Sequence, residues 1–187
     1  MDNSQHRNRD IPPIYQRVLT EFDSTLAKQA LEWFDSPDQW SLYVTGALGS
    51  GKTCFVAALL MKWRETHPDE MHDGIVYSRA PQCFFVAPYT LSREIRSLGD
   101  EDTVYDHWQK GRGLLVLDDV GALRSTPHLT ERLVNLLQYR YDYQLKTIVS
   151  SNLLISQIAN HVDPRTASRL QEGVMVTLGK IDRRRKR

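Results

Sequence analysis

The chain has 187 residues, enough for one domain with its own hydrophobic core. Hydrophobic residues make up 41% and charged residues 25%, and a net charge of +1 excludes a polycation that binds nucleic acid over its whole surface. Two cysteines exclude a disulfide framework, and the longest apolar run, residues 54–61, is too short to cross a membrane. Since the polar N-terminus lacks a signal-peptide core, we expect a cytoplasmic protein with no membrane partner.

The N-terminal forty residues predict a lead-in and one helix. The prolines at 12 and 13 favour an extended segment over residues 11–15. Apolar spacing predicts a helix over residues 24–34 that ends at Ser36-Pro37. We therefore expect residues 1–40 to precede a nucleotide-binding core that covers residues 41–187 and carries a basic C-terminal tail.

A strand, a glycine-rich loop and a helix follow one another from residue 40. Residues 40–45 are β-branched and aromatic and predict a buried strand, and the apolar run from residue 54 predicts a helix that ends near His67-Pro68. Between them lies the phosphate-loop pattern Gly46-Ala47-Leu48-Gly49-Ser50-Gly51-Lys52-Thr53. Its backbone N–H groups would surround phosphate oxygens at the positive end of the helix. Lys52 would add charge, Thr53 would bind Mg²⁺, and Cys54 would follow as a small residue beside the nucleotide.

Residues 83–119 predict two more strands with two helices between them. Residues 83–87 read as a strand, residues 90–98 as a helix capped by Thr90, and residues 101–110 as a shorter helix. Residues 114–117 are an apolar run that leads into Asp118 and Asp119, the pattern of a strand buried on both faces that ends in carboxylates. Asp118 would hold Mg²⁺ through water, and Asp119 would orient the attacking water.

The last third of the chain repeats the alternation of helix and strand. It predicts a helix over 129–141, a strand over 147–152, a helix over 164–171 with proline first, and a strand over 174–178. Asn152 either contacts water or the γ-phosphate, or caps a helix that begins at Leu153, and both roles are compatible. The alternation predicts a doubly wound α/β domain with about five parallel strands, whose order the pattern leaves open.

Four segments together resemble the AAA+ ATPases of the DnaC and IstB group, which are bacterial helicase loaders and transposition ATPases. The segments are GALGSGKT at 46–53, LLVLDDVG at 114–121, TIVSSN at 147–152 and RTASRLQEG at 165–173. The resemblance covers nearly the whole chain. It implies an AAA+ P-loop NTPase core with strand order 5-1-4-3-2, flanking helices and little or no C-terminal lid domain.

The resemblance also implies roles for single residues in an ATPase that uses ATP and Mg²⁺. Asp119 takes the catalytic position, Asn152 matches sensor 1, and Arg169 matches the arginine finger supplied to a neighbouring subunit of a homo-oligomer. Arg184 matches sensor 2, with Arg183 as its competitor, because the segment at 179–184 carries one residue more than the family motif. Ile14 and Tyr15 fall where the family's lead-in packs near adenine.

The helical pair over residues 90–110 lies where related ATPases carry an element that touches single-stranded DNA. Cations and rings suited to nucleic acid lie on it and just after it, namely Arg93, Arg96, Tyr105, His107, Trp108, Lys110 and Arg112. The alternative is an amphipathic pair of helices with a solvated outer face.

The resemblance implies a switch that assembles with ATP on single-stranded DNA and a replicative helicase. The alternatives are a transposition ATPase that recruits a transposase to duplex DNA, and a small-molecule kinase. Helicase loaders normally carry a separate N-terminal domain, for which few residues precede the phosphate loop. We therefore expect either a core-only member, a chain cut to its core, or a partner that docks elsewhere.

Overall fold

The computed structural model describes residues 10–67, 70–72, 75–77, 83–96, 103–123 and 126–179. Its centre is a five-stranded sheet of order β4-β5-β6-β1-β7, in which every pairing is parallel. Counted along these five strands, the order is 5-1-4-3-2, which confirms the predicted fold. The strands are β1 (Ser41–Gly46), β4 (Phe84–Val86), β5 (Leu115–Leu117), β6 (Thr147–Ser151) and β7 (Val174–Leu178).

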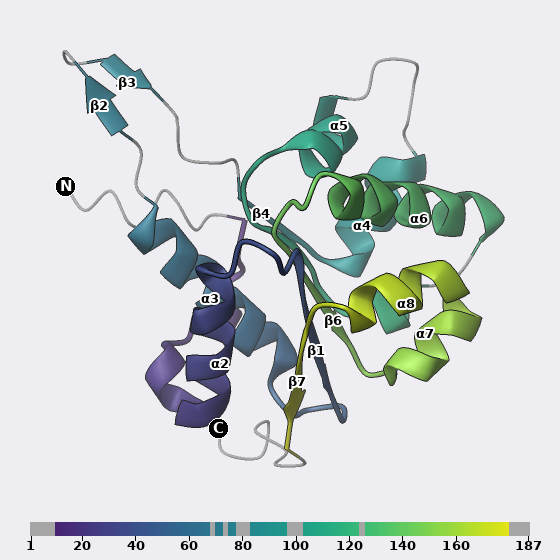
Figure 1. The fold of residues 1–187 in the computed structure, drawn as a ribbon, viewed down its shortest axis with the longest axis horizontal. Coiled ribbons are helices and arrows are strands. Elements are labelled where there is room, and N and C mark those ends of the chain that lie inside the picture. Colours follow the sequence, from purple (N-terminus) through teal and green to yellow (C-terminus); the bar gives the residue numbers. More distant parts are fainter. Residues whose placement is uncertain are drawn as a thin grey trace.

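Helices cover both faces of the sheet (Figure 1). One face carries α2 (Ser24–Phe34) and α3 (Lys52–Thr66), together with the 3-10 turns η1 (Pro13–Tyr15) and η2 (Leu19–Glu21). The other face carries α4 (Pro88–Arg96), α5 (Thr103–Lys110), α6 (Pro127–Asp142), α7 (Ile155–His161) and α8 (Pro164–Gln171). None of the helices in these described ranges is long and apolar enough to cross a membrane.

Three local predictions are corrected at prolines, and two strands that were not predicted also form. The lead-in turns at η1 instead of running extended, because Pro13 suits the first position of a helical turn. Helix α4 begins at Pro88, so Thr90 does not cap it, and α6 likewise begins earlier than predicted, at Pro127 after the N-cap Thr126. The strands β2 (Glu70–His72) and β3 (Ile75–Tyr77) pair antiparallel between α3 and β4, in a segment for which no element was predicted.

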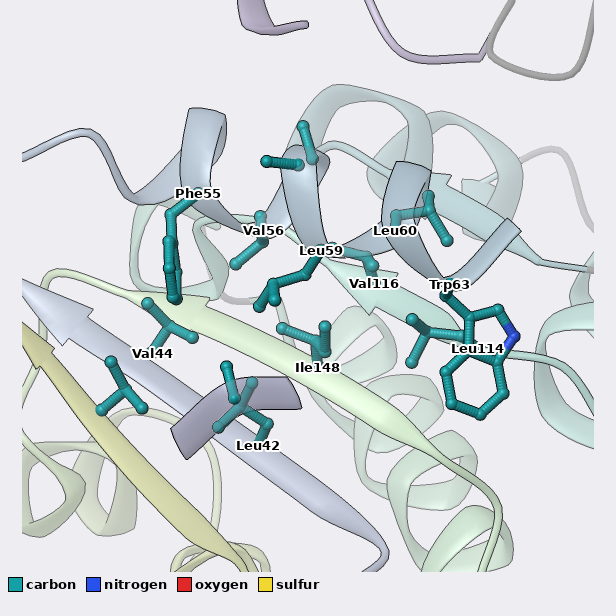
Figure 2. Packing of buried hydrophobic residues seen from close by; sticks show 14 of the residues in the cluster. Leu42, Val44, Phe55, Val56, Leu59, Leu60, Trp63, Leu114, Val116 and Ile148 are labelled. Carbon is teal, nitrogen blue, oxygen red and sulfur yellow. The ribbon is translucent and has the colours of Figure 1, made fainter. Parts of the chain in front are cut away.

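Side chains on the two faces of β1 pack in two separate hydrophobic cores. Leu42 and Val44 point toward α3 and pack with Phe55, Leu59 and Ile148, as Figure 2 shows. Tyr43 points to the opposite face and packs in the second core, beneath α4–α8. Burial on both faces is the reason that this strand is apolar without the alternation of a half-exposed strand.

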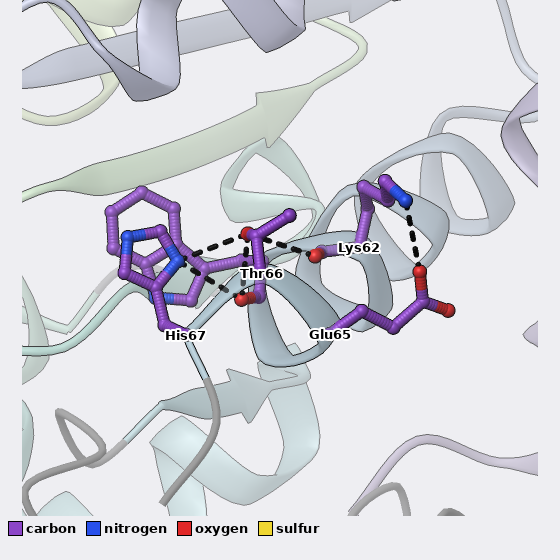
Figure 3. A network of polar contacts seen from close by, with 5 residues as sticks. Lys62, Glu65, Thr66 and His67 are labelled. Carbon is purple, nitrogen blue, oxygen red and sulfur yellow. Dashed lines mark hydrogen bonds and ion pairs between the residues drawn. The ribbon is translucent and has the colours of Figure 1, made fainter. Parts of the chain in front are cut away.

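The end of α3 is closed by its own side chains (Figure 3). The Thr66 hydroxyl donates to the carbonyl of Lys62 at 3.2 Å, and the His67 ring stacks on Trp63 at 4.0 Å between centroids. His67 Nδ1 also lies 3.1 Å from the Trp63 carbonyl. The helix therefore ends at the predicted position, before Pro68.

A buried arginine, which the sequence analysis missed, connects α6 to the sheet. Arg140 is buried, and its guanidinium donates to the Thr147 hydroxyl at 2.7 Å and to four carbonyls, those of Trp108, Gly111, Gly113 and Lys146, at 2.7–2.9 Å. Burial lowers the pKa of Arg140 to about 9. All five guanidinium N–H groups have acceptors, so the charge is solvated by the backbone and holds the turn after α5 against β6.

Candidate nucleotide-binding site

The phosphate loop leaves the carboxyl end of β1 and enters α3 through three glycines in unusual conformations. Gly49 and Gly51 have φ values of 81° and 92°, in the left-handed region where other residues are strained. A Cβ on Gly46 would lie 2.8 Å from the carbonyl oxygen of Leu178 on β7. The loop can pass this close to β7 only because the position is glycine.

Lys52 is folded back over the loop that precedes it. Its ammonium group donates to the carbonyls of Gly46 and Ala47, at 2.9 and 3.1 Å, and the residue is only 7% exposed. The ammonium thus lies inside the loop, at the N-terminal end of the 15-residue helix α3. Three sources of positive potential converge there: the ammonium, the loop N–H groups and the helix dipole. Phosphate is the ligand that this arrangement favours.

Ser150 on β6 connects the two acidic residues that follow β5. Leu117 is in register with Val149, so Asp118 and Ser150 are the next residues along the two neighbouring strands. The Ser150 hydroxyl donates to Asp118 Oδ1 at 2.6 Å and accepts from the Asp119 N–H at 2.9 Å. Sequence reasoning missed Ser150, although its signal was present in the Ser-Ser-Asn ending of the predicted strand.

Asp118 is a buried carboxyl whose hydrogen bonds do not fully offset the cost of burying its charge. It is 6% exposed, and burial raises its pKa, whereas hydrogen bonds from Ser150 and Thr53 oppose that shift. Thr53 and Asp118, the two predicted Mg²⁺ residues, are therefore in contact. A carboxylate and a hydroxyl beside a phosphate loop fit Mg²⁺, which binds few protein oxygens and completes its shell with phosphate and water. Bound there, Mg²⁺ would neutralise charge on the phosphates.

Asp119 has a strained backbone and a carboxylate oxygen without a partner. Its φ and ψ are 46° and 50°, a left-handed conformation that a non-glycine residue adopts at some cost. The bond from its N–H to Ser150 holds this conformation. Among the described residues, the buried Oδ1 of Asp119 has no hydrogen-bond partner. A side chain in this state is available to orient a water molecule.

The loop after β6 brings Asn152 to the same edge of the sheet. The hydroxyls of Tyr43 and Thr45 on β1 both donate to the carbonyl of Leu153, at 2.8 and 3.0 Å. Burial raises the pKa of Tyr43 to about 12, so this donor keeps its proton at neutral pH. Asn152 Oδ1 lies 2.3 Å from where a Cβ on Gly121 would be, so its amide faces the turn that follows Asp119.

The second role considered for Asn152 is wrong. Helix α7 begins at Ile155, and its N-cap is Leu154, whose N–H donates to the Gln157 side chain at 2.8 Å. Asn152 lies before this cap and is exposed. Contact with water or the γ-phosphate remains a prediction for this residue.

Changing Ser150 to alanine is expected to impair hydrolysis more than nucleotide binding. The change removes a hydrogen bond to a carboxylate, worth about 1.5–3 kcal/mol, so we expect kcat to fall roughly 10- to 100-fold. Since the Ser150 bond lowers the pKa of Asp118, its loss raises that pKa further, and the acid limb of the pH–rate profile moves to higher pH. Steady-state kinetics from pH 5 to 9 measure both effects.

Ser41→Ala is the matched control for Ser150→Ala. Ser41 is equally buried, on the neighbouring strand β1, and its hydroxyl has no hydrogen-bond partner among the described residues. Its loss should leave kcat and the pH profile unchanged. A Ser150→Ala protein with wild-type kcat and an unshifted acid limb would contradict a role for Ser150 in holding Asp118.

Arg169 lies at the opposite edge of the sheet from its own phosphate loop. Its carbonyl accepts from the Trp40 indole N–H at 3.2 Å, and Trp40 directly precedes β1, whereas the loop follows the other end of that strand. A strand of six residues spans roughly 20 Å, more than an arginine side chain can reach. Arg169 is therefore not placed to contact a nucleotide in its own subunit.

The structure divides the predicted DNA-contacting residues into two groups. Tyr105 and Trp108 are each 3% exposed and pack in the core beneath α4–α8, so the stacking role predicted for these rings is corrected. The Tyr105 hydroxyl is also bonded, to the Arg132 carbonyl at 2.8 Å. The cations Arg93, Lys110 and Arg112 are exposed, and Arg96 lies on α4.

Tyr89, which was not predicted, is an exposed aromatic ring on α4. It is 72% exposed in the first turn of α4, and the Arg93 guanidinium lies 5.9 Å from its ring centroid. Because α4 follows the carboxyl end of β4, Tyr89 lies at the same edge of the sheet as the phosphate loop. The apolar stripe pattern that turned Tyr105 and Trp108 inward could have been read from the sequence, as could Tyr89 outside that stripe.

Two further predictions remain outside what the geometry tests. Arg184 and its competitor Arg183 lie outside the described residues. Residues 180–187 lie outside them as well, so the prediction of little or no C-terminal lid domain stays a prediction. Ile14 is half exposed in η1, and Tyr15 packs partly against the core under α3. Their proximity to adenine stays a prediction.

The sheet order, the phosphate loop and the paired aspartates define the fold of an AAA+ P-loop domain. The chain is 31% identical over 123 residues to the replicative helicase loader DnaI of Bacillus subtilis (strain 168), a match that covers 64% of this chain and 35% of that protein. No family model matches the chain. The match thus spans about a third of the curated relative's length.

Solved structures share the same fold. A crystal structure of DnaI superposes with a TM-score of 0.67 at 22% identity, over 88% of this chain and 92% of that one. The DnaC helicase loader gives a TM-score of 0.64 at 18% identity, over 92% and 98%. AMPPCP-bound DnaA from Aquifex aeolicus gives 0.68 at 16% identity, over 90% and 50%. These structural matches confirm the predicted AAA+ fold, and the sequence match to DnaI supports the predicted resemblance to helicase loaders.

Proposed function

We propose that this chain is an Mg²⁺-dependent AAA+ ATPase of DNA replication that acts as a helicase loader-like switch. ATP binding drives assembly of several copies on single-stranded DNA and a replicative helicase, and hydrolysis releases them. The observation that carries the proposal is the division of the catalytic groups. Lys52, Asp118 and Asp119 meet at one edge of the sheet, and Arg169 lies at the other. A second subunit would bring the two edges together.

The chemistry proposed is in-line attack of water on the γ-phosphate. Asp119 orients the water through its unpartnered oxygen, and Lys52 and the loop N–H groups hold the β- and γ-phosphates. Asn152 contacts the water or the γ-phosphate from the end of β6. Arg169 of a neighbouring subunit supplies positive charge as the phosphoryl group transfers. Catalysis by positioning and charge needs no covalent intermediate on the protein.

The partners proposed follow from the relatives and from the surface at the nucleotide edge. The curated relative is a replicative helicase loader, and one structural neighbour is a DnaA bound to AMPPCP and single-stranded DNA, which matches with a TM-score of 0.68 at 16% identity. This favours a loader over the transposition ATPase, and the AAA+ strand order leaves no support for the small-molecule kinase. Tyr89 and Arg93 take the stacking role first given to Tyr105 and Trp108, with Arg96, Lys110 and Arg112 as further cations.

Single-stranded DNA binding should depend on ATP, on salt and on Tyr89. Stacking of a base on an aromatic ring is worth about 1–3 kcal/mol, so Tyr89→Ala should weaken binding roughly 5- to 150-fold. Affinity should also fall linearly on a log–log plot against salt, because cations on the protein release counterions from phosphates. Fluorescence anisotropy with a labelled oligonucleotide and a non-hydrolysable ATP analogue measures both effects.

Duplex DNA and a buried tyrosine supply the controls. A loader should prefer the single strand, whereas tighter binding of the duplex would favour the transposition ATPase. Tyr105→Phe removes a hydroxyl but no exposed surface, so it should leave DNA affinity unchanged. If Tyr89→Ala also binds like the wild type, the stacking role proposed for Tyr89 is wrong.

A further inference from the structure

The Arg169 guanidinium stacks on the ring of Tyr141, a contact that the sequence did not predict. Its guanidinium carbon lies 4.8 Å from the Tyr141 centroid, in the range of a cation–π contact. Tyr141 comes from α6 and Arg169 from α8, so the contact joins two helices that lie side by side in Figure 1. Both residues lie near the C-terminal ends of their helices, at the sheet edge away from the phosphate loop.

The ring is itself held from two sides. The Tyr141 hydroxyl donates to Glu172 Oε2 at 2.9 Å, and this bond raises the pKa of Tyr141. The Trp40 ring meets Tyr141 edge-on, with centroids 5.6 Å apart and planes at 85°. Trp40 also donates to the Arg169 carbonyl. Trp40 therefore contacts the ring of Tyr141 and also the backbone of Arg169, which stacks on that ring.

This way of holding an arginine leaves its hydrogen-bond donors available. Stacking uses the flat face of a guanidinium, and its five N–H groups point outward in the plane. A salt bridge would occupy some of them, but the nearby Glu172 accepts from Tyr141 instead, and among the described residues no ion pair to Arg169 occurs. The contact limits the rotamers of Arg169 while its donors remain free to bind phosphate.

We propose that Tyr141, supported by Glu172 and Trp40, is a positioning residue that holds Arg169 ready for the nucleotide of a neighbouring subunit. The inference rests on the proposed function, because it requires Arg169 to act in trans. Tyr141 does not touch the nucleotide itself. Its effect should therefore appear only in the subunit that donates the arginine.

The test uses mixtures in which donor and acceptor are different proteins. Asp119→Asn supplies the arginine but has an inactive site, and Arg169→Ala supplies the site but no arginine. Tyr141→Leu, which keeps apolar volume but lacks the ring, is placed in either partner. In the donor it should lower the kcat of the mixture roughly two- to fivefold, as expected for loss of an exposed cation–π contact. In the acceptor it should have no effect, and Tyr141→Phe in the donor should retain most activity.

Titration of the donor separates positioning from assembly. Loss of positioning lowers the plateau rate but leaves the donor concentration at half-maximum unchanged. Tyr143→Ala, which removes an exposed ring at the same helix end, is the matched control and should match the unmodified donor. Equal loss with Tyr141→Leu in either partner, or no loss in the donor, overturns the inference. If the parent mixture without Tyr141 changes fails to hydrolyse ATP, the trans arginine is wrong instead.

Discussion

Two inactive variants, Arg169→Ala and Asp119→Asn, are expected to regain ATP hydrolysis when they are mixed. Each alone lacks one half of the catalytic arrangement. Arg169→Ala keeps Lys52, Asp118 and Asp119 at its nucleotide edge, whereas Asp119→Asn keeps the arginine at the opposite edge. An arginine finger is worth about 10³–10⁵ in kcat, so Arg169→Ala should be nearly inactive. Asp119→Asn should be nearly inactive because it lacks the carboxylate that would orient the attacking water. Interfaces that join an intact site to an intact arginine should restore a measurable fraction of the wild-type rate.

Protein concentration and nucleotide binding supply the controls for this mixture. Rescue should rise with total protein, because it depends on association, and single-stranded DNA should strengthen it if DNA drives assembly. Both parents should bind a fluorescent ATP analogue, since both keep Lys52 and the loop. A mixture as inactive as its parents, under conditions where the wild type assembles and turns over, would contradict an arginine supplied in trans. Arg169 would then be a structural residue on Tyr141.

Lys52→Ala should lose nucleotide binding, whereas Asp119→Asn should lose only turnover. Lys52 provides the one side-chain cation within the phosphate loop, and charge-assisted bonds to phosphate are worth about 1.5–3 kcal/mol each. We expect Lys52→Ala to weaken ATP binding by roughly a hundredfold or more. In the proposed mechanism Asp119 orients the attacking water and does not hold the nucleotide, so its amide variant should bind ATP with nearly wild-type affinity.

Equilibrium titration with a fluorescent ATP analogue compares the two variants directly. Thermal melting without nucleotide checks the fold, which matters because Lys52 also bonds the carbonyls of Gly46 and Ala47. Lys62→Ala, on the exposed side of the same helix, is the matched loss of a lysine and should bind like the wild type. Wild-type affinity in Lys52→Ala would show that the phosphate-loop assignment is wrong, and equal loss in both variants would remove the division of roles.

Local patterns were sufficient for the nucleotide motif and for most elements. The phosphate loop is a continuous segment whose glycines, lysine and threonine act together through backbone geometry, so its neighbours along the chain identify it. Helix α8 and strand β7 have the bounds that capping and apolar pattern predicted, since Asp163 and Pro164 are strong start signals. Helices α4 and α6 begin earlier than predicted because Pro88 and Pro127 each occupy the first helical position, where proline is favoured.

Contacts between distant segments were decided only by the tertiary structure. Ser150 became part of the site because β6 lies between β1 and β5 in a register that places it beside Asp118. The place of Arg169 on Tyr141 depends on how α8 packs against α6. Sequence alone determined the phosphate loop and most of the strands and helices, because those follow from local backbone preference and apolar period. Strand order, register and the burial of a given side chain follow from the free energy of packing the whole chain, which no local segment contains.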